Sequence, residues 1–391
     1  MNVLTILAVV AAAVPAIPAV IFFIECVASV FLRAGKQVAR PGGVSLKVMI
    51  PAHDEELGIG ATLAEVQCQL APDDRILVVA DNCRDGTAEI ALAAGAEVIE
   101  RADSEQRGKG YALAYGIDHL ASNPPDVLIV IDADCHLNPG TIDALVRSAV
   151  ETGRPVQADY VLEPTDRSPI SMISALAFLV RNRVRPRGLL RLKQPCHLDG
   201  TGMAFPWRVV RNAPGLGGSI VEDLTMGIEL ALEGHEPVFC IDAGVRSRLP
   251  GTESAAMQQR RRWEHGQLAT LVQYGPRLIC QGVSRRRLGL VAMGADLMVP
   301  PLAMLVGLLV LVLSAAGVLV LVGGSPVPLW IALVALGLIA LGVGVGWARY
   351  GRAEVPLRYL LLVPLYIVWK VPLYFSFLVG RGEKRWRRTE R

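Results

Sequence analysis

The sequence has little charge and lacks the cysteine pairs that mark metal or redox modules. Charged side chains make up 19% of its 391 residues, against about 25% in soluble domains. The seven cysteines are scattered and form no C-x-x-C pair, which excludes zinc ribbons and thioredoxin-type motifs. A net charge of +3 is too small to indicate a nucleic-acid partner. Because 52% of the residues are hydrophobic, disorder is excluded and a membrane location is favoured.

The hydrophobic residues gather in blocks long enough to cross a bilayer. Residues 3–32 contain one charge, Glu25, and residues 288–348 also contain one, Asp296. A helix needs about 20 apolar residues to cross the hydrocarbon core. The first block therefore predicts one span, and the second predicts two spans after an interfacial or re-entrant half-helix. An acid inside a span is either functional or faces neighbouring helices, and both readings stay open for Glu25. The expected spans are residues 3–32, 302–322 and 329–347.

A third hydrophobic block, residues 359–380, is interrupted by Pro364, Lys370 and Pro372. Basic residues follow the first span, flank the second block and fill the C-terminal tail, and loops rich in Lys and Arg stay on the cytoplasmic side. We therefore expect a broken helix at the inner face, because a span here would carry the basic tail outside. The expected division is an N-terminal transmembrane helix at 1–32, a cytoplasmic domain at 33–288, a re-entrant segment with two transmembrane helices at 289–348, and an interfacial or re-entrant helix with a basic tail at 349–391.

The polar region between the spans alternates apolar runs with segments of helical spacing. The expected strands are residues 47–52, 76–80, 96–101 and 127–131, and the expected helices are residues 59–70, 87–94, 109–120 and 138–151. The last helix should begin at Asn138-Pro139, a capping and first-turn pair. Apolar strands alternating with helices predict an α/β fold, with a mostly parallel sheet covered by helices on both faces. Ligands bind such sheets at the carboxyl ends of the strands.

Acidic side chains follow three of these strands. Asp132 and Asp134 end the strongest one, where residues i and i+2 project to the same side. Two carboxylates so placed suit Mg²⁺ or Mn²⁺, which take oxygen ligands from carboxylates and substrate phosphates. The D-x-D pattern is frequent by chance, and the acidic turn at Asp85 is better read as a helix cap.

Three further segments suit phosphate binding or proton transfer, and each also has an ordinary structural reading. Residues 107–110 (RGKG) open a helix whose N-terminus and Lys109 suit a phosphate, or they form a plain basic loop. Asp223 begins a helix, so it stays ionised and can accept a proton, or it only caps that helix. Residues 259–263 (QRRRW) offer Arg262 to a diphosphate, or they anchor the chain at the membrane surface.

A stretch without acids between Arg181 and Lys193 carries six basic residues, namely Arg181, Arg183, Arg185, Arg187, Arg191 and Lys193. One interpretation is a site for an anionic lipid-linked acceptor such as a polyprenyl diphosphate sugar. The other is attraction to the anionic inner leaflet of the membrane.

Seven motifs occur in order along the chain: IPAHDEE (50–56), ADNCRDGT (80–87), RGKGYAL (107–113), DAD (132–134), GTGM (200–203), ED (222–223) and QRRRW (259–263). Their order and spacing resemble those of membrane-bound family-2 glycosyltransferases, of which cellulose and hyaluronan synthases are larger members. The resemblance covers residues 45–275. It implies a glycosyltransferase-A-like fold flanked by transmembrane helices, and an inverting, metal-dependent enzyme.

The resemblance also implies roles for individual residues. Around the nucleotide it implies Pro51, His53, Glu55, Asp81 and Lys109. Asp132 and Asp134 are implied to handle the ribose, the diphosphate and Mg²⁺ or Mn²⁺, with Asp134 as the more direct ligand, and Asp223 is the implied general base. On the diphosphate and acceptor side it implies Gln259, Arg262, Trp263, Gly202 and Met203.

This sequence departs from the family pattern at two places. Asp54 stands where the family usually has Asn, which adds negative charge beside the nucleotide. Residues 198–203 differ from the acceptor motif of cellulose synthases, so the acceptor is left open while the donor interpretation is unaffected.

The sequence thus predicts a bacterial inner-membrane enzyme that moves a sugar from a UDP- or GDP-linked donor to a lipid or lipid-linked acceptor, with inversion, in exopolysaccharide or cell-envelope glycan synthesis. A processive synthase that translocates its polymer is one alternative, although three firm spans are few for a channel. Direct transfer to ceramide or polyprenyl phosphate is another. A scaffold that only binds nucleotide sugars is the non-enzymatic alternative.

Overall fold

The computed structural model describes residues 3–32, 39–214, 217, 221–248 and 253–378. Within these, the side chains of residues 253–256 and 375–378 are not described. The predicted basic residues at 33–36 and the predicted tail beyond residue 378 lie outside this range. The chain divides into two compact units. Among the described residues, the sheet unit comprises those within 39–165 and 195–259, and the membrane-helix unit comprises those within 3–32, 166–194 and 260–378.

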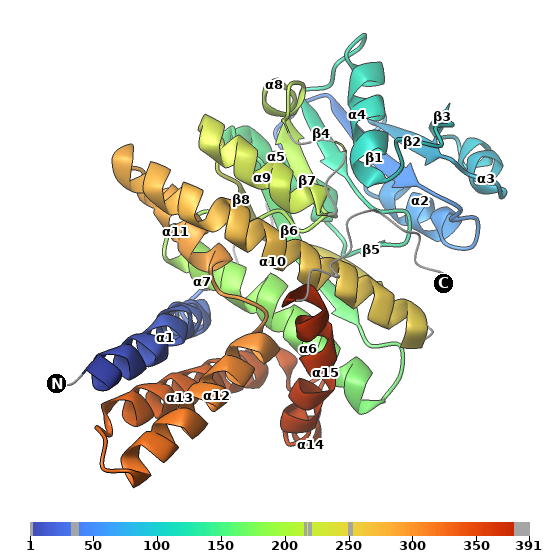
Figure 1. The fold of residues 1–391 in the computed structure, drawn as a ribbon. Helices are drawn as coiled ribbons and strands as arrows, with labels where there is room; N and C mark the ends of the chain where they lie inside the picture. The colour runs from blue at the N-terminus through green and yellow to red at the C-terminus, as the bar shows by residue number, and fades with distance from the viewer. Residues whose placement is uncertain (1–2, 33–38, 215–216, 218–220, 249–252, 379–391) are drawn as a thin grey trace. The chain divides into compact units, whose positions relative to one another are not determined.

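The sheet unit is built on one mixed sheet with the strand order β3-β2-β1-β4-β7-β6-β8-β5 (Figure 1). Its strands are β1 (Leu46–Ala52), β2 (Arg75–Asp81), β3 (Glu97–Arg101), β4 (Val127–Val130), β5 (His136–Leu137), β6 (Val156–Glu163), β7 (Met203–Pro206) and β8 (Val238–Arg248). Strands β1 to β4 pair in parallel, whereas β7 runs antiparallel to β4 and β6. The parallel half therefore brings the ends of β1, β2 and β4 to one edge.

Helices cover both faces of this sheet, as the sequence predicts. They are α2 (Ile59–Gln67), α3 (Thr87–Ala93), α4 (Lys109–Leu120), α5 (Thr141–Thr152), α8 (Trp207–Val210) and α9 (Glu222–Glu233). On one face, Leu113 of α4 and Leu230 of α9 pack in one buried cluster with Met49 of β1. The neighbouring strand residues Val48 and Ile50 are also fully buried and point to the opposite face.

One predicted helix start is wrong by three residues. The helix expected from Asn138 begins at Thr141, after Gly140 in a left-handed conformation with φ 78°. The Asn138 side chain instead accepts a hydrogen bond of 2.7 Å from Arg246 Nη2. Asn138 is therefore a tertiary contact and not the helix cap.

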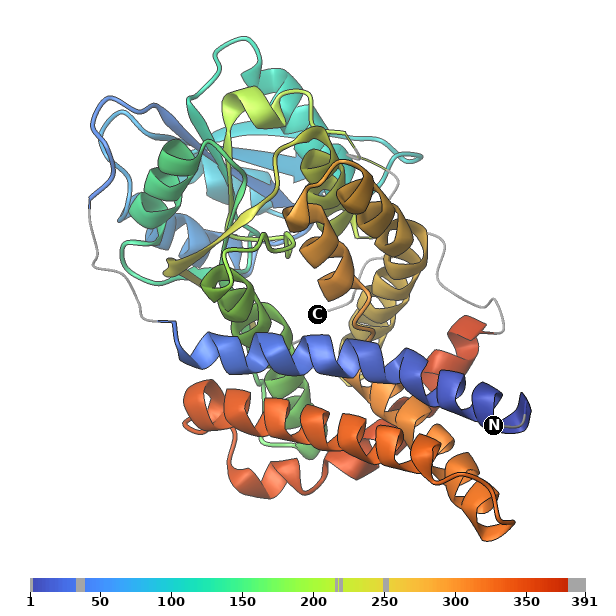
Figure 2. The same ribbon diagram turned by 90° about the vertical axis from the view of Figure 1, so that its left-hand side faces the viewer.

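The membrane-helix unit contains three helices that are long and apolar enough to cross a membrane, judged by length and composition over the described residues: Val3–Val30, Leu302–Leu321 and Val327–Gly351. They correspond to α1 (Val3–Val30), α12 (Leu302–Leu321), and α13 (Val327–Gly346) continued by the π-helical turn η2 (Trp347–Gly351). Helices α1 and α13 lie side by side (Figures 1 and 2), and a Cβ on Gly342 would lie 2.8 Å from the ring of Phe22.

The other helices of this unit are shorter or partly polar. They are α6 (Pro169–Leu179), the π-helical turn η1 (Val180–Val184), α7 (Arg185–Arg191), α11 (Leu288–Leu297), α14 (Leu357–Leu360) and α15 (Val363–Leu378). Helix α10 (Glu253–Ser284) passes from the sheet unit into this one. The predicted half-helix before Pro300-Pro301 is α11. The broken helix expected at 359–380 is present as α14 and α15, and its position at the inner face stays a prediction.

Two charged residues of this unit form a buried ion pair. Arg185 Nε donates to Glu25 Oε2 at 2.6 Å, and Glu25 is 3% exposed. Glu25 therefore faces neighbouring helices, which is the second of the two interpretations given for this acid within an apolar span. Arg185 is 7% exposed and is used in this contact, so it does not act with the other basic residues of 181–193 at a membrane or ligand surface.

Candidate active site

The D-x-D carboxylates sit in a tight turn directly after β4. Asp132 N donates to Thr201 Oγ1 at 3.0 Å, and Thr62 Oγ1 donates to the carbonyl oxygen of Ala133 at 2.8 Å, so two threonines fix the turn. Ligand atoms of Asp132, Asp134 and Cys135 all lie within 4.8 Å of one another. Asp132 and Asp134 thus lie close together as predicted, but a turn after β4 brings them together and not the alternation of side chains along a strand.

The donor set of this turn fits a hard divalent cation. Two carboxylates supply the oxygen ligands that Mg²⁺ and Mn²⁺ prefer. Burial raises the pKa of the Cys135 thiol well above its usual value, and the charges of Asp134 and Asp132 raise it further. Cys135 therefore stays a neutral thiol, and Asp132 and Asp134 are the residues that suit the ion.

Lys109 lies at the start of α4 and forms an ion pair with Asp132. Its Nζ also donates to the carbonyl oxygen of Gly200 at 2.5 Å. Burial on its own would lower the pKa of Lys109, but the carboxylates of Asp132, Glu222 and Asp223 outweigh it and raise that pKa. Burial raises the pKa of Asp132, with Lys109 opposing it and the neighbouring acids adding to it. Lys109 is thus a cation held among carboxylates.

Asp223 reaches the same place from the first turn of α9. A Cβ on Gly200 would lie 3.0 Å from Asp223 Oδ2 and 3.7 Å from Lys109 Nζ. Gly200 has φ +92°, a backbone conformation that L side chains rarely adopt. Since Lys109 is paired with Asp132, the loop at Gly200 brings together three residues that are far apart in the sequence. The acidic groups exceed the basic one here, which favours a bound cation.

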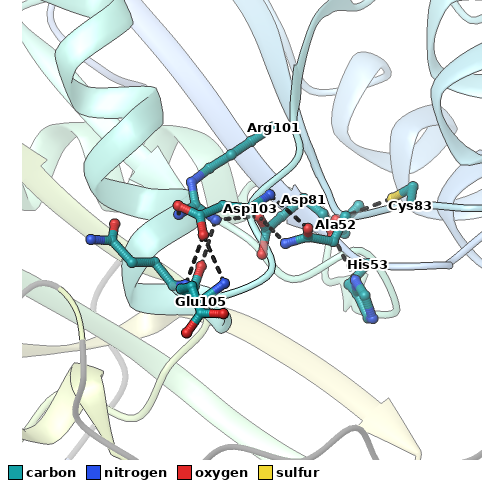
Figure 3. Close-up of polar contacts among 9 residues, drawn as sticks. Ala52, His53, Asp81, Cys83, Arg101, Asp103 and Glu105 are labelled. Carbon is teal, nitrogen blue, oxygen red and sulfur yellow. Dashed lines mark hydrogen bonds and ion pairs between the residues drawn. The ribbon is translucent and has the colours of Figure 1, made fainter.

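A second polar network lies at the ends of β2 and β3, as Figure 3 shows. Arg101 Nη1 donates to Asp81 Oδ1 at 2.7 Å, and Arg101 Nη2 donates to Asp103 Oδ2 at 3.1 Å. Asn82 Nδ2 donates to the same Asp81 oxygen at 3.0 Å, and Asn82 Oδ1 accepts from Asp103 N at 2.8 Å. Sequence reasoning found Asp81 but missed Arg101, because a strand residue twenty positions away gives no local signal.

The end of β1 is tied to the same network. His53 Nδ1 lies 2.6 Å from the carbonyl oxygen of Asp81, as drawn in Figure 3. Glu55 N donates to Thr87 Oγ1 at 2.8 Å, and Pro51 is a β1 residue paired in register with Val79. The predicted nucleotide residues Pro51, His53, Glu55 and Asp81 therefore come from two neighbouring strand ends.

The loop after β1 contains the departure at position 54. Asp54 has φ 52°, and its Oδ1 accepts a hydrogen bond of 2.6 Å from Arg84 N. Ligand atoms of Asp54, Cys83 and Asp85 lie within 4.8 Å of one another, which makes a second cluster of metal-ligand type. Asp85 Oδ1 accepts from Thr87 N at 3.1 Å, but the N-cap residue of α3 is Gly86. The interpretation of Asp85 as the cap is therefore corrected by one position, because Asp85 binds the first turn from the residue before the cap.

Two residues expected at the acceptor entrance belong to the interior. Met203 lies on β7 with 0% exposure and packs in the cluster under α4 and α9. A Cβ on Gly202 would lie 2.7 Å from the Ala158 side chain and 2.8 Å from that of Val245. The expectation that they line the entrance is corrected, because neither offers surface to a ligand.

The predicted diphosphate and acceptor residues Gln259, Arg262 and Trp263 are half-buried residues of α10. The ring of Trp263 lies 5.8 Å from that of Phe178 on α6, within the membrane-helix unit. Trp263 therefore packs against Phe178, a contact that the sequence did not predict. The assignment of these three residues to the diphosphate stays a prediction.

The sheet, the D-x-D turn and the neighbouring Lys109 and Asp223 define a protein of the glycosyltransferase-A class. The profile of the family described as "Glycosyltransferase like family 2" matches residues 41–266. The chain belongs to this family, and the expectation of a glycosyltransferase is confirmed at that level.

Similar proteins agree with this assignment. The chain is 34% identical over 111 residues to a 4,4′-diaponeurosporenoate glycosyltransferase of Staphylococcus aureus (strain bovine RF122 / ET3-1), which is 28% of this chain and 27% of that protein. The protein of the same name from strain MRSA252 is 33% identical over 106 residues, or 26% of this chain and 27% of the relative. The chain thus matches about a quarter of the length of these relatives.

A solved structure extends the likeness to nearly the whole chain. It is the mannosyltransferase PcManGT from Pyrobaculum calidifontis in complex with GDP-Man and Mn²⁺, with a TM-score of 0.54 and 18% identity, covering 94% of this chain and 100% of that one. At this identity the likeness shows the fold.

Proposed function

We propose that this protein transfers a sugar from a nucleotide-diphosphate donor to a hydroxyl of a lipid or lipid-linked acceptor at the cytoplasmic face of a bacterial inner membrane. The observation that carries the proposal is the convergence of Lys109, Asp132 and Asp223 around Gly200. In a family-2 glycosyltransferase, such a cluster at the carboxyl edge of the sheet suits a donor diphosphate and a catalytic base.

Each residue of the cluster has a role in this proposal. Asp132 and Asp134 hold a divalent ion, which when bound neutralises charge on the leaving diphosphate. Lys109 supplies a positive charge beside the same phosphates. Asp223 accepts the proton of the acceptor hydroxyl while the hydroxyl oxygen attacks the anomeric carbon of the donor sugar. The attack comes from the side opposite the nucleoside diphosphate, which leaves. The attack from that side forms the new glycosidic bond with inverted configuration.

The donor nucleotide is assigned to the network at the ends of β1 and β2. His53 and Asp81 are joined there, and Arg101 and Asn82 fix the Asp81 carboxylate. A fixed carboxylate and a ring nitrogen at a strand end suit hydrogen bonds to a base or ribose. The GDP-Man and Mn²⁺ named with the similar mannosyltransferase support a nucleotide-sugar donor and a divalent metal.

The acceptor is assigned to the membrane on two grounds. Three helices are long and apolar enough to span. The Staphylococcus aureus relatives are named for glycosyl transfer to 4,4′-diaponeurosporenoate. Exopolysaccharide or cell-envelope glycan synthesis is the pathway class we favour.

Membranes that carry the full-length protein, incubated with a panel of radiolabelled UDP- and GDP-sugars, test the proposal. We expect one donor to label a lipid fraction, and we expect a divalent-metal chelator to abolish the labelling. Asp223→Asn should lower the rate about 10²- to 10⁴-fold. Asp118→Asn is the matched control, because Asp118 is an exposed residue of α4 and should leave the rate unchanged. Labelling that survives complete chelation, or that survives Asp223→Asn, would contradict the proposed roles.

Product length separates the proposal from a processive synthase. If each acceptor molecule receives a single sugar, the enzyme is not processive. If the products form a series of polymers of increasing length, the enzyme polymerises the sugar. Tests with ceramide and with polyprenyl phosphate as acceptors distinguish direct transfer to either lipid.

A further inference from the structure

The C-terminal ends of two candidate spans meet at Tyr350. Helices α1 and α13 run in the same direction, since Phe22 of α1 lies beside Gly342 and Tyr350 Oη donates to the carbonyl oxygen of Ser29 at 2.7 Å. Figure 2 shows the two helices alongside each other. Ser29 lies near the end of α1, so Tyr350 lies where both apolar helices end.

Two arginines from different elements contact this one ring. Arg187 of α7 lies 5.2 Å from the Tyr350 ring centroid, and Arg349 of η2 lies at the same distance of 5.2 Å. Each guanidinium gains a cation–π contact, so two positive charges lie beside the same ring. An anion beside this ring would be attracted by both positive charges.

The position of Arg187 is fixed by a buried ion network on the other side of α7. Arg185 donates to Glu25 Oε2 through Nε at 2.6 Å and to Asp296 Oδ1 through Nη2 at 2.6 Å. A Cβ on Gly188 would overlap the carbonyl oxygen of Glu25, so α7 packs in close contact with α1. Glu25 and Ser29 are one helical turn apart, and they hold α7 and η2 respectively against the same helix.

Both arginines lie next to π-helical turns that pack together. A Cβ on Gly346, just before η2, would lie 3.2 Å from Val184 in η1. Arg187 follows η1 by three residues, and Arg349 is part of η2. Single π-helical turns interrupt a helix at a cost and are frequent at functional sites. Each arginine that contacts the Tyr350 ring therefore lies within or close to a π-helical turn.

We propose that Arg187 and Arg349 form a binding site for the phosphate of an anionic membrane-lipid headgroup. Lipid headgroups lie where an apolar span ends, and tyrosine and arginine are typical of that level. The planar guanidinium fork matches phosphate oxygens. The site lies wholly within the membrane-helix unit and does not depend on the proposed sugar transfer.

The test uses purified, delipidated full-length protein in a neutral detergent, without nucleotide sugar. Its thermal unfolding is followed while short-chain phosphatidylglycerol, phosphatidylcholine or inorganic phosphate is added. Phosphatidylglycerol should raise the melting temperature in a saturable way and phosphatidylcholine should not. Stabilisation by inorganic phosphate at equal concentration would show a free-anion site and overturn the assignment to a lipid.

Variants locate the effect at Tyr350. Arg349→Gln should raise the apparent Kd for phosphatidylglycerol at least about fivefold. Arg352→Gln removes the same charge from an exposed position three residues further on, and should leave the Kd within about twofold. Equal loss in both variants would mean general surface attraction and would overturn the proposal. Native mass spectrometry of bound lipid supplies a second readout that does not depend on thermal stability.

Discussion

The loop at Gly200 offers a substitution that separates backbone strain from displacement of the proposed base. Gly200→Ala places a methyl group 3.0 Å from Asp223 Oδ2, closer than carbon and oxygen normally approach. The residue also has φ +92°, which costs an L side chain about 1–2 kcal/mol. The Asp223 carboxylate must move by a few tenths of an ångström to relieve the contact. A misplacement of about 1 Å can cost 10²-fold in rate, so we expect a loss of about tenfold.

Gly95→Ala is the matched control for this prediction. Gly95 also has a positive φ, +81°, but a Cβ there meets nothing within 4 Å. Both variants should therefore lose about 1–2 kcal/mol of stability, whereas Gly200→Ala alone should lose transfer activity beyond that expected from stability. Thermal unfolding and initial rates of radiolabelled sugar transfer give the two quantities. If Gly200→Ala transfers sugar as fast as Gly95→Ala, the proposed position of Asp223 in the reaction is refuted.

Three further predictions test the remaining contacts. Arg101→Met leaves the buried Asp81 carboxylate with its Asn82 hydrogen bond but without the Arg101 cation, and should cost about 3–5 kcal/mol in unfolding free energy. Adding Asp81→Leu should recover part of this cost. A hydrogen bond from His119 lowers the pKa of Glu97 in the folded protein. The ionised Glu97 therefore stabilises the fold at pH values above the ordinary glutamate pKa of about 4.3. This stabilisation is lost as the pH falls through the lowered pKa of the folded state. Glu97→Gln should therefore flatten the acid side of the stability–pH curve, and an unchanged acid slope would count against this contact. Met203→Ala should lower the free energy of unfolding by about 2–5 kcal/mol without changing which acceptor is used. A change of acceptor would show that Met203 does line the acceptor entrance.

Much of the sheet unit is predictable from local pattern. Continuous apolar runs predict β1, β2 and β4 to within one residue at each end, because buried parallel strands need such residues on both faces. The clustering of Asp132 and Lys109 follows from the rule that ligand sites form where parallel strands end. Three of the four expected helices begin where predicted, at Ile59, Thr87 and Lys109. The fourth start is missed because Gly140 takes a left-handed φ that no propensity for Asn138-Pro139 can show.

Contacts between distant segments are the part that sequence reasoning missed. Arg101 and Asp81 are paired through the register of β2 and β3, which local sequence does not determine. Met203 was expected beside the acceptor because the motif next to it is functional in the family, yet a strand residue with no exposed surface serves the core. Arg185 looks like its basic neighbours in sequence, and only its burial against Glu25 separates it from them.

Crystals of the protein with Mn²⁺ and a nucleoside diphosphate, measured for anomalous scattering, test the central claim most directly. We expect one strong manganese peak between Asp132 and Asp134, with the diphosphate beside Lys109. A peak at Asp54, Cys83 and Asp85 with none at the first pair would contradict it.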